Sequence, residues 1–179
     1  MLNNRQHWFP LQVLVFGMPG IPSIYYGSEF GIEGRKENGS DDGLRPALRL
    51  EDFVGGNDGT QEAATPAGRG RLESAANPYL AFMAALIRAY HVVPALACGD
   101  YEQLVLTNRQ YAFRRGDLNQ GGAIVAVNND EAEAGFWVRC PDGTYRGLLG
   151  GAEFTAAGGG ANICLGACAG EIFVRKQTV

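Results

Sequence analysis

Dense apolar stretches alternate with breaker residues at the start of the chain. Residues 4–16 are apolar on almost every side of a helix, and Gly17 and Pro19 end the stretch. This pattern predicts a short helix that begins near Trp8. The next run, residues 21–26, is short, apolar and aromatic, as is typical of a strand buried on both faces. Such a strand needs parallel neighbours, and the chain offers no second candidate, so we expect a piece of a larger barrel or sheet.

Polar and glycine-rich sequence follows from residue 28 to about residue 76, which is typical of a long functional loop. Asn77 and Pro78 then predict the start of a helix, as an N-cap followed by proline at the first helical position. Apolar side chains recur there at steps of three and four residues and give one continuous face. Pro94 ends the pattern. We interpret the apolar face as core.

From about residue 96 onward the apolar period changes from helical to two. Short alternating segments separated by turn residues predict an antiparallel β-sandwich. Trp137, Phe136 and Tyr145 form a possible sugar-stacking platform on it, but we favour their packing in the core. The expected strands are residues 101–107, 110–114, 123–128, 136–140, 144–149, 162–165 and 171–175.

Composition narrows the class of protein. The chain has 179 residues, 46% of them hydrophobic, and a net charge of −4 with no basic run, which argues against nucleic acid as a partner. No apolar run is long enough for a membrane span, and no signal-peptide pattern opens the chain. The four cysteines are scattered and show no metal-site spacing, so we expect buried, inert thiols in a reducing compartment, which favours the cytoplasm.

The run GMPGIPSIYYGSEFG, residues 17–31, resembles the eighth barrel strand of the α-amylase family, glycoside hydrolase family 13. Residues 96–101 resemble the segment that leads from that barrel into the C-terminal β domain, and residues 111–115 and 124–129 resemble its first strands. The resemblance implies an α+β chain. Residues 1–95 would be the last helix–strand–loop–helix part of a (β/α)8 barrel, and residues 96–179 an antiparallel sandwich.

The same resemblance implies which chemistry the chain carries. The three catalytic carboxylates of the family lie at the ends of earlier barrel strands, so no catalytic residue is expected here. No cofactor is expected in this chain, although calcium binds many complete relatives. The resemblance implies substrate-binding roles for Tyr26 and Glu29, at the end of the eighth strand, and for Asp41 and Arg45 in the following loop. For Glu29, anchoring of the loop is the alternative that we favour.

Asp41 and Arg45 suit sugar recognition chemically. A carboxylate accepts hydrogen bonds from neighbouring hydroxyls, and a guanidinium donates in a fixed planar fork. A solvated loop with an ordinary exposed ion pair is the equally weighted alternative. Asp42 can replace Asp41 if the loop length differs.

These expectations converge on the C-terminal part of an α-amylase-like glycoside hydrolase that acts on α-linked glucans with retention of configuration. The chain would supply one wall of the sugar cleft but no catalyst, and would be inactive alone. A non-catalytic carbohydrate-binding or interaction module is the alternative, and the product of a broken gene is a third. The apolar residues 8–26 would favour self-association.

Overall fold

The computed structural model of the chain describes residues 4–32, 34, 36, 39–44 and 77–176. Contacts divide the chain into two compact units: residues 1–23 together with 84–179, and residues 24–83. The proposed boundary at residue 95 stays a prediction. The helices in chain order are η1 (Arg5–His7), α1 (Trp8–Gly17), η2 (Ser28–Phe30), η3 (Asp42–Leu44), α2 (Pro78–Val92) and α3 (Pro94–Cys98). The strands are β1 (Tyr101–Leu106), β2 (Gln110–Arg115), β3 (Ala123–Asn128), β4 (Ala134–Arg139), β5 (Gly143–Gly147), β6 (Glu153–Ala156), β7 (Gly160–Leu165) and β8 (Ala169–Arg175).

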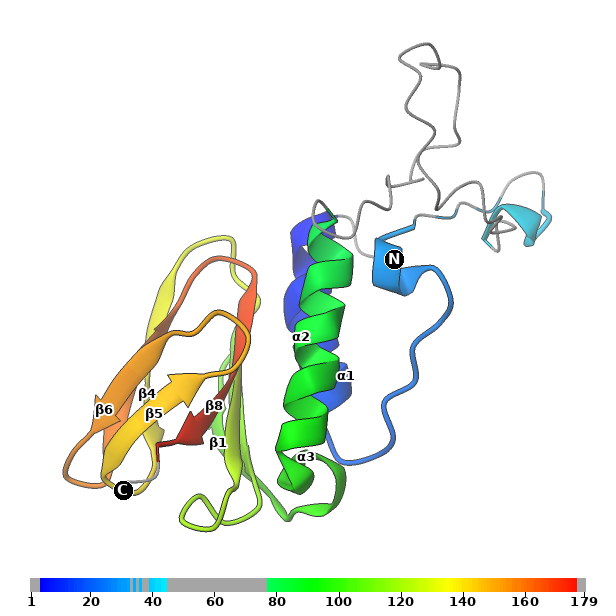
Figure 1. Cartoon of the computed structure of the whole chain (residues 1–179). Helices are drawn as coiled ribbons and strands as arrows, with labels where there is room; N and C mark the ends of the chain where they lie inside the picture. Colours follow the sequence, from blue (N-terminus) through cyan, green and yellow to red (C-terminus); the bar gives the residue numbers. More distant parts are fainter. Residues whose placement is uncertain (1–3, 33, 35, 37–38, 45–76, 177–179) are drawn as a thin grey trace. The chain divides into compact units, whose positions relative to one another are not determined.

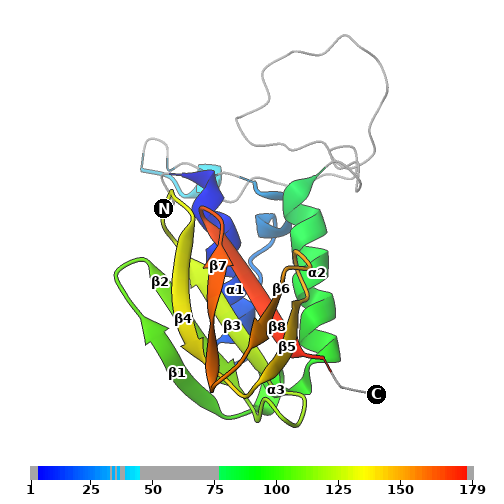
Figure 2. The same cartoon turned by 90° about the vertical axis from the view of Figure 1, so that its left-hand side faces the viewer.

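Figure 1 shows the strands of the first unit. Six of them form an antiparallel sheet in the order β1-β2-β3-β8-β5-β6. All six residues of β3 are buried, because this central strand pairs with β2 on one edge and β8 on the other. The remaining two strands, β4 and β7, pair with each other as a separate sheet. Figure 2 shows this pair in front of the large sheet. The predicted antiparallel β domain is therefore confirmed.

The core of the β domain lies between the two sheets. Alternate side chains of β4 and β7 point inward, and Tyr145 and Phe173 of the large sheet meet them. Phe154 stacks on Tyr145 and contacts the edge of Phe173. The buried members are Ala112, Leu118, Ile124, Ala126, Val138, Cys140, Tyr145, Ala156, Ala161, Ile163, Leu165 and Phe173.

Helix α1 covers the other face of the large sheet, against β3 and β8 (Figure 2). The helix approaches the sheet closely at two points. A Cβ on Gly17 would lie 2.7 Å from Val125, and one on Gly170 would lie 2.8 Å from Val13. Glycine is therefore needed for the helix to reach the sheet at these two points. Both faces of β3 are consequently covered, which explains its continuous apolar run.

Three buried polar side chains connect the elements of this unit. Arg115 donates to the carbonyl oxygens of Gly17 (2.7 Å) and Gly99 (3.1 and 3.3 Å). Its burial lowers the pKa of its guanidinium. Glu171 accepts from three backbone N–H groups at 2.7–2.9 Å, and Asn128 donates to three carbonyl oxygens at 2.8–3.2 Å. Each group thereby recovers the hydrogen bonds that burial removes.

Both predicted helices are confirmed. Helix α1 begins at Trp8 and ends at Gly17. Helix α2 begins at Pro78, and the Oδ1 atom of Asn77 accepts from the N–H groups of Tyr79 (3.0 Å) and Leu80 (3.2 Å), as an N-cap should.

The strand predicted over residues 21–26 is not formed. The segment has no regular structure, and Ile21 is 93% exposed, with Ile24, Tyr25 and Tyr26 also exposed. A parallel strand forms only when hydrogen-bonding neighbours are present, and no strand among the described residues pairs with it. The described residues therefore do not form the parallel strand that would mark the end of a barrel.

Two further expectations were wrong. Trp137 is not in the core: it is 57% exposed, because Phe136 and Val138 take the inward positions of β4. Cys98 and Cys164 are exposed, whereas Cys140 and Cys168 are buried as expected. Strand β6 was not predicted; its four residues are too short to show alternation clearly.

Candidate functional site

The expected sugar-binding residues Tyr26 and Glu29 lie in a tight turn of the second unit. Gly27 and Gly31 adopt left-handed conformations on either side of η2, with φ of 86° and 67°. The ring of Tyr26 contacts that of Tyr25, with a centroid distance of 4.9 Å. The Oε2 atom of Glu29 is buried and has no hydrogen-bond partner among the described residues. An unpaired buried carboxylate oxygen is an acceptor for which these residues supply no donor.

Asp41 lies on an exposed loop next to η3. Its carboxylate forms an ion pair with Lys36, with Nζ 3.0 Å from Oδ1. Arg45, the expected partner of Asp41, lies outside the described residues. The described interactions do not join Tyr26, Glu29 and Asp41 to one another, so their grouping in one sugar site stays a prediction.

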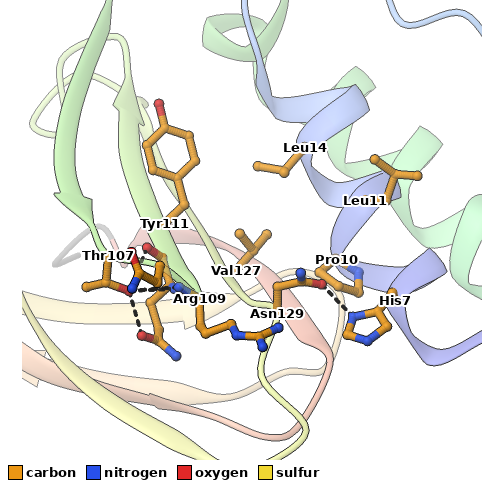
Figure 3. Close-up of a pocket in the computed structure, with 11 residues that line it drawn as sticks. His7, Pro10, Leu11, Leu14, Thr107, Arg109, Tyr111, Val127 and Asn129 are labelled. Carbon is orange, nitrogen blue, oxygen red and sulfur yellow. Dashed lines mark hydrogen bonds between the residues drawn. The ribbon is translucent and has the colours of Figure 1, made fainter. Parts of the chain in front are cut away.

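A cavity of about 440 Å³ lies between α1 and the turn that joins β1 to β2 (Figure 3). Pro10, Leu11 and Leu14 of α1 form its apolar side, and Arg109 lies across from them. The ring of His7 contacts Asn129 at its rim, with 2.6 Å between Nδ1 and Oδ1. No carboxylate is among the residues that line the cavity. It therefore lacks the acid pair that glycoside hydrolysis requires.

A second cavity, of about 600 Å³, opens between β1, β2 and β4 and does contain carboxylates. Glu102 lies between two guanidinium groups, 2.5 Å from Nε of Arg114 and 2.5 Å from Nη2 of Arg139. The hydrogen bond from Arg114, together with the charges of both arginines, lowers the pKa of Glu102. A general acid of a glycosidase needs a raised pKa, so Glu102 is suited to an ion pair and not to catalysis.

Cys168 approaches His7, with 3.6 Å between Sγ and Nδ1. Burial raises the pKa of the Cys168 thiol, so it stays protonated and is a poor nucleophile.

No group of three or more His, Cys, Asp or Glu side chains that could hold a metal ion occurs among the described residues. In the same part of the chain, no helix combines the length and the apolar character needed to cross a membrane.

Sequence reasoning missed the ionic cluster around Glu102 and the buried hydrogen bonds of Arg115 and Glu171. Arg114 and Arg115 are adjacent in sequence, and alternation along β2 sends them to opposite faces. The one available signal was a charged pair inside an otherwise apolar strand pattern. Which of its two members is buried depends on α1, because α1 covers the face to which Arg115 points.

Comparisons with known proteins agree with this architecture. The family model of the alpha amylase C-terminal all-beta domain matches residues 105–176. A cyclomaltodextrinase from a Bacillus species is 29% identical over 134 residues, which are 74% of this chain. The alpha-amylase from Geobacillus thermoleovorans, solved with acarbose, matches 98% of the chain with a TM-score of 0.68 and 19% identity. The cyclomaltodextrin glucanotransferase CldA matches 98% with a TM-score of 0.71 and 18% identity.

The expected resemblance to the α-amylase family is thereby confirmed: residues 105–176 match the model of the alpha amylase C-terminal all-beta domain, and the cyclomaltodextrinase is similar over most of the chain. The likeness to the two solved structures shows a shared fold. The chain spans 19% of the cyclomaltodextrinase and 35% and 33% of the two solved structures.

Proposed function

We propose that the chain is the C-terminal part of a glycoside hydrolase that acts on α-linked glucans with retention of configuration. The observation that carries the proposal is the match of residues 105–176 to the C-terminal domain of alpha amylases. The names of the relatives agree, since a cyclomaltodextrinase and an alpha-amylase solved with acarbose are among them. In this proposal the β domain stabilises the protein, and the catalytic carboxylates lie on segments other than this chain.

In the same proposal, residues 1–95 complete a catalytic barrel. The similarity to solved amylase-family structures extends over 98% of the chain, which supports a shared arrangement before the β domain as well. Residues 21–26 then gain the parallel neighbours that they lack here, and their exposed apolar side chains become covered. Tyr26, Glu29, Asp41 and Arg45 would lie at the carboxyl end of that strand, the face on which barrel enzymes bind substrate.

The first test is turnover by the chain alone. We expect no cleavage of starch or maltooligosaccharides, because the catalytic carboxylates of the family lie on earlier barrel strands and the pKa of Glu102, which is held between two arginines, is lowered. Hydrolysis that persists through repurification and scales with this protein would contradict the proposal.

The second test uses a longer protein in which this chain follows the remaining barrel strands. Such a protein should hydrolyse α-glucans, and replacing Asp41 or Arg45 by alanine should weaken binding of sugars at the outer subsites on the non-reducing side of the cleavage point. Losing one charge-assisted hydrogen bond should cost about 1–3 kcal/mol. Lys36→Ala is the matched control, since Lys36 is an exposed side chain of the same loop that pairs with Asp41 but is not an expected sugar ligand. Unchanged KM values for long and short substrates in the Asp41 and Arg45 variants would remove both residues from the site.

The proposal also accounts for an expected tendency to associate. Ile21, Ile24, Tyr25 and Tyr26 form a run of exposed apolar side chains, which other copies of the chain can cover. We expect the isolated chain to be larger than a monomer by light scattering. Replacing Ile21 and Tyr25 by serine should shift it toward monomer. A monodisperse wild-type monomer would contradict this part of the proposal.

A further inference from the structure

The outer face of the β4–β7 pair carries an unusual set of side chains. Alternation places Gly135, Trp137 and Arg139 of β4 on this face, opposite the exposed Asn162 and Cys164 of β7. Trp137 is the one large apolar side chain among them, and it is 57% exposed. The other tryptophan of the chain, Trp8, is buried. A half-exposed indole on the outer face of a sheet leaves apolar surface whose cover by a ligand would be favourable.

The indole of Trp137 can lie against the sheet because Gly160 has no side chain. A Cβ built on Gly160 would lie 2.2 Å from Cζ2 and 2.7 Å from Cε2 of the ring, so no other residue fits beneath it. The ring therefore rests directly on the backbone of β7, with its remaining surface open to solvent. The described residues make no hydrogen bond to its N–H group, and the side chain as a whole is exposed. The result is a fixed aromatic surface with a free donor at its edge.

Planar polar groups flank the ring. Asn162 is the cross-strand partner of Trp137, and its amide makes no hydrogen bond within the described part of the chain. This amide lies over Gly135, where a Cβ would be 3.2 Å from Nδ2. On the other side, Arg139 uses Nη2 to contact Glu102, and its side chain remains 68% exposed, with no further hydrogen bond of its guanidinium among the described residues. A free amide and a free guanidinium edge thus border one apolar surface.

This arrangement is better suited to binding a pyranose ring than to binding a protein partner. A sugar ring offers one patch of C–H groups, which packs on an aromatic face, and a rim of hydroxyls, which need donors and acceptors around that face. A protein partner needs a larger apolar patch, whereas the neighbours of Trp137 on this face are glycine, cysteine, asparagine and arginine. Nucleic acid is disfavoured because Glu102 neutralises Arg139 and the net charge is −4.

We propose that Trp137, Asn162 and Arg139 form a carbohydrate-binding platform that holds a glucose unit of an α-glucan chain. Trp137 stacks on the sugar ring, and Asn162 and Arg139 hydrogen-bond its hydroxyls. The choice of α-glucan rests on the proposed function. The platform binds without turnover, and it shares no residue with the sugar-binding residues expected at positions 26–45.

The test measures binding of maltoheptaose and β-cyclodextrin to the full 179-residue chain by calorimetry. Trp137→Ala should lower affinity at least tenfold, and Asn162→Ala should lower it severalfold. Gly160→Ala keeps the tryptophan but must displace its ring, so it should also weaken binding. Leu106→Ala is the matched control, because Leu106 is also an exposed strand residue (64%) but lies on β1, outside the platform. Circular dichroism checks that each variant is folded.

Fluorescence provides an independent reading, since Trp8 is buried and Trp137 is the exposed tryptophan. Maltoheptaose should change the emission of the wild type and leave that of Trp137→Phe unchanged. Absence of α-glucan binding by the wild type, or full affinity in folded Trp137→Ala, would overturn the platform. Equal binding of cellohexaose would overturn the α-linked assignment. These measurements require no catalysis. A failure of the platform proposal can therefore be distinguished from a failure of the proposed function, which would show as a longer protein that does not hydrolyse starch.

Discussion

Two apolar runs of six residues behave in opposite ways in this molecule. Strand β3 (Ala123–Asn128) is buried along its whole length, whereas residues 21–26 have no regular structure and expose most of their large side chains. Both runs are rich in the residue types that favour strands. The difference lies in their neighbours: β3 pairs with β2, which precedes it in sequence, and with β8, while residues 21–26 pair with no described strand. Strand-forming composition becomes a strand only where hydrogen-bonding partners exist.

The same contrast holds for buried carboxylates. Glu171, in the β domain, accepts from backbone N–H groups through both of its oxygens. Glu29 has a buried Oε2 with no partner among the described residues. The β domain therefore supplies the partners of its buried carboxylate, whereas the turn around Glu29 leaves an acceptor for which a ligand or another segment could supply a donor.

The largest expected effect tests the difference in burial. Phe173→Ala should cost about 3–5 kcal/mol of the free energy of unfolding, because it leaves a cavity in the core beside Phe154. Ile21→Ala should change it by no more than about 0.5 kcal/mol, since Ile21 is exposed. Urea unfolding followed by circular dichroism measures both. Similar losses in the two variants would show that residues 21–26 are packed in solution.

The next effect concerns the buried guanidinium of Arg115. Arg115→Ala removes the donors from the carbonyl oxygens of Gly17 and Gly99, and should cost about 2–4 kcal/mol. Arg109→Ala is the matched control on the exposed turn before β2 and should cost no more than about 0.5 kcal/mol. Denaturant midpoints of the two variants give the comparison. A small loss for Arg115→Ala would mean that water replaces the guanidinium at both carbonyls.

A smaller effect depends on pH. Because Arg114 and Arg139 lower the pKa of Glu102 in the folded state, its ion pairs stabilise the fold above the unfolded pKa, and this stability is lost as pH falls through the folded pKa. The wild type should therefore exceed Glu102→Gln in melting temperature at neutral pH, and the difference should shrink toward acid. A difference that stays constant below the ordinary glutamate pKa would contradict the direction of the shift.

The smallest effect is expected at the exposed pair of Asp41 and Lys36. Asp41→Asn should change stability by less than about 1 kcal/mol, and added salt should reduce the difference, because both side chains are solvated. Thermal melts at low and high ionic strength measure this. A large, salt-independent loss would place Asp41 in a packed environment that the described contacts do not show.

The sequence by itself determined the local features of this protein. Helix α1 begins at the predicted residue, Asn77 caps α2, and most strands of the β domain lie where alternation placed them. The resemblance to the α-amylase family also needed only the sequence. These features depend only on neighbours within a few residues. An N-cap depends on the N–H groups that follow it, and a strand is recognised by its alternation of apolar and polar residues.

Only the tertiary structure decided which face of each element is inside. Alternation along β4 separates Trp137 from Phe136, but the packing of β4 on the large sheet determines that the tryptophan is the outward one. The division into two sheets, the burial of Arg115 under α1 and the absence of a strand at residues 21–26 depend likewise on segments far apart in sequence. The local sequence pattern defines the two faces of a segment and favours a strand there. Contact with distant segments determines which of the two faces is buried and whether the strand forms at all.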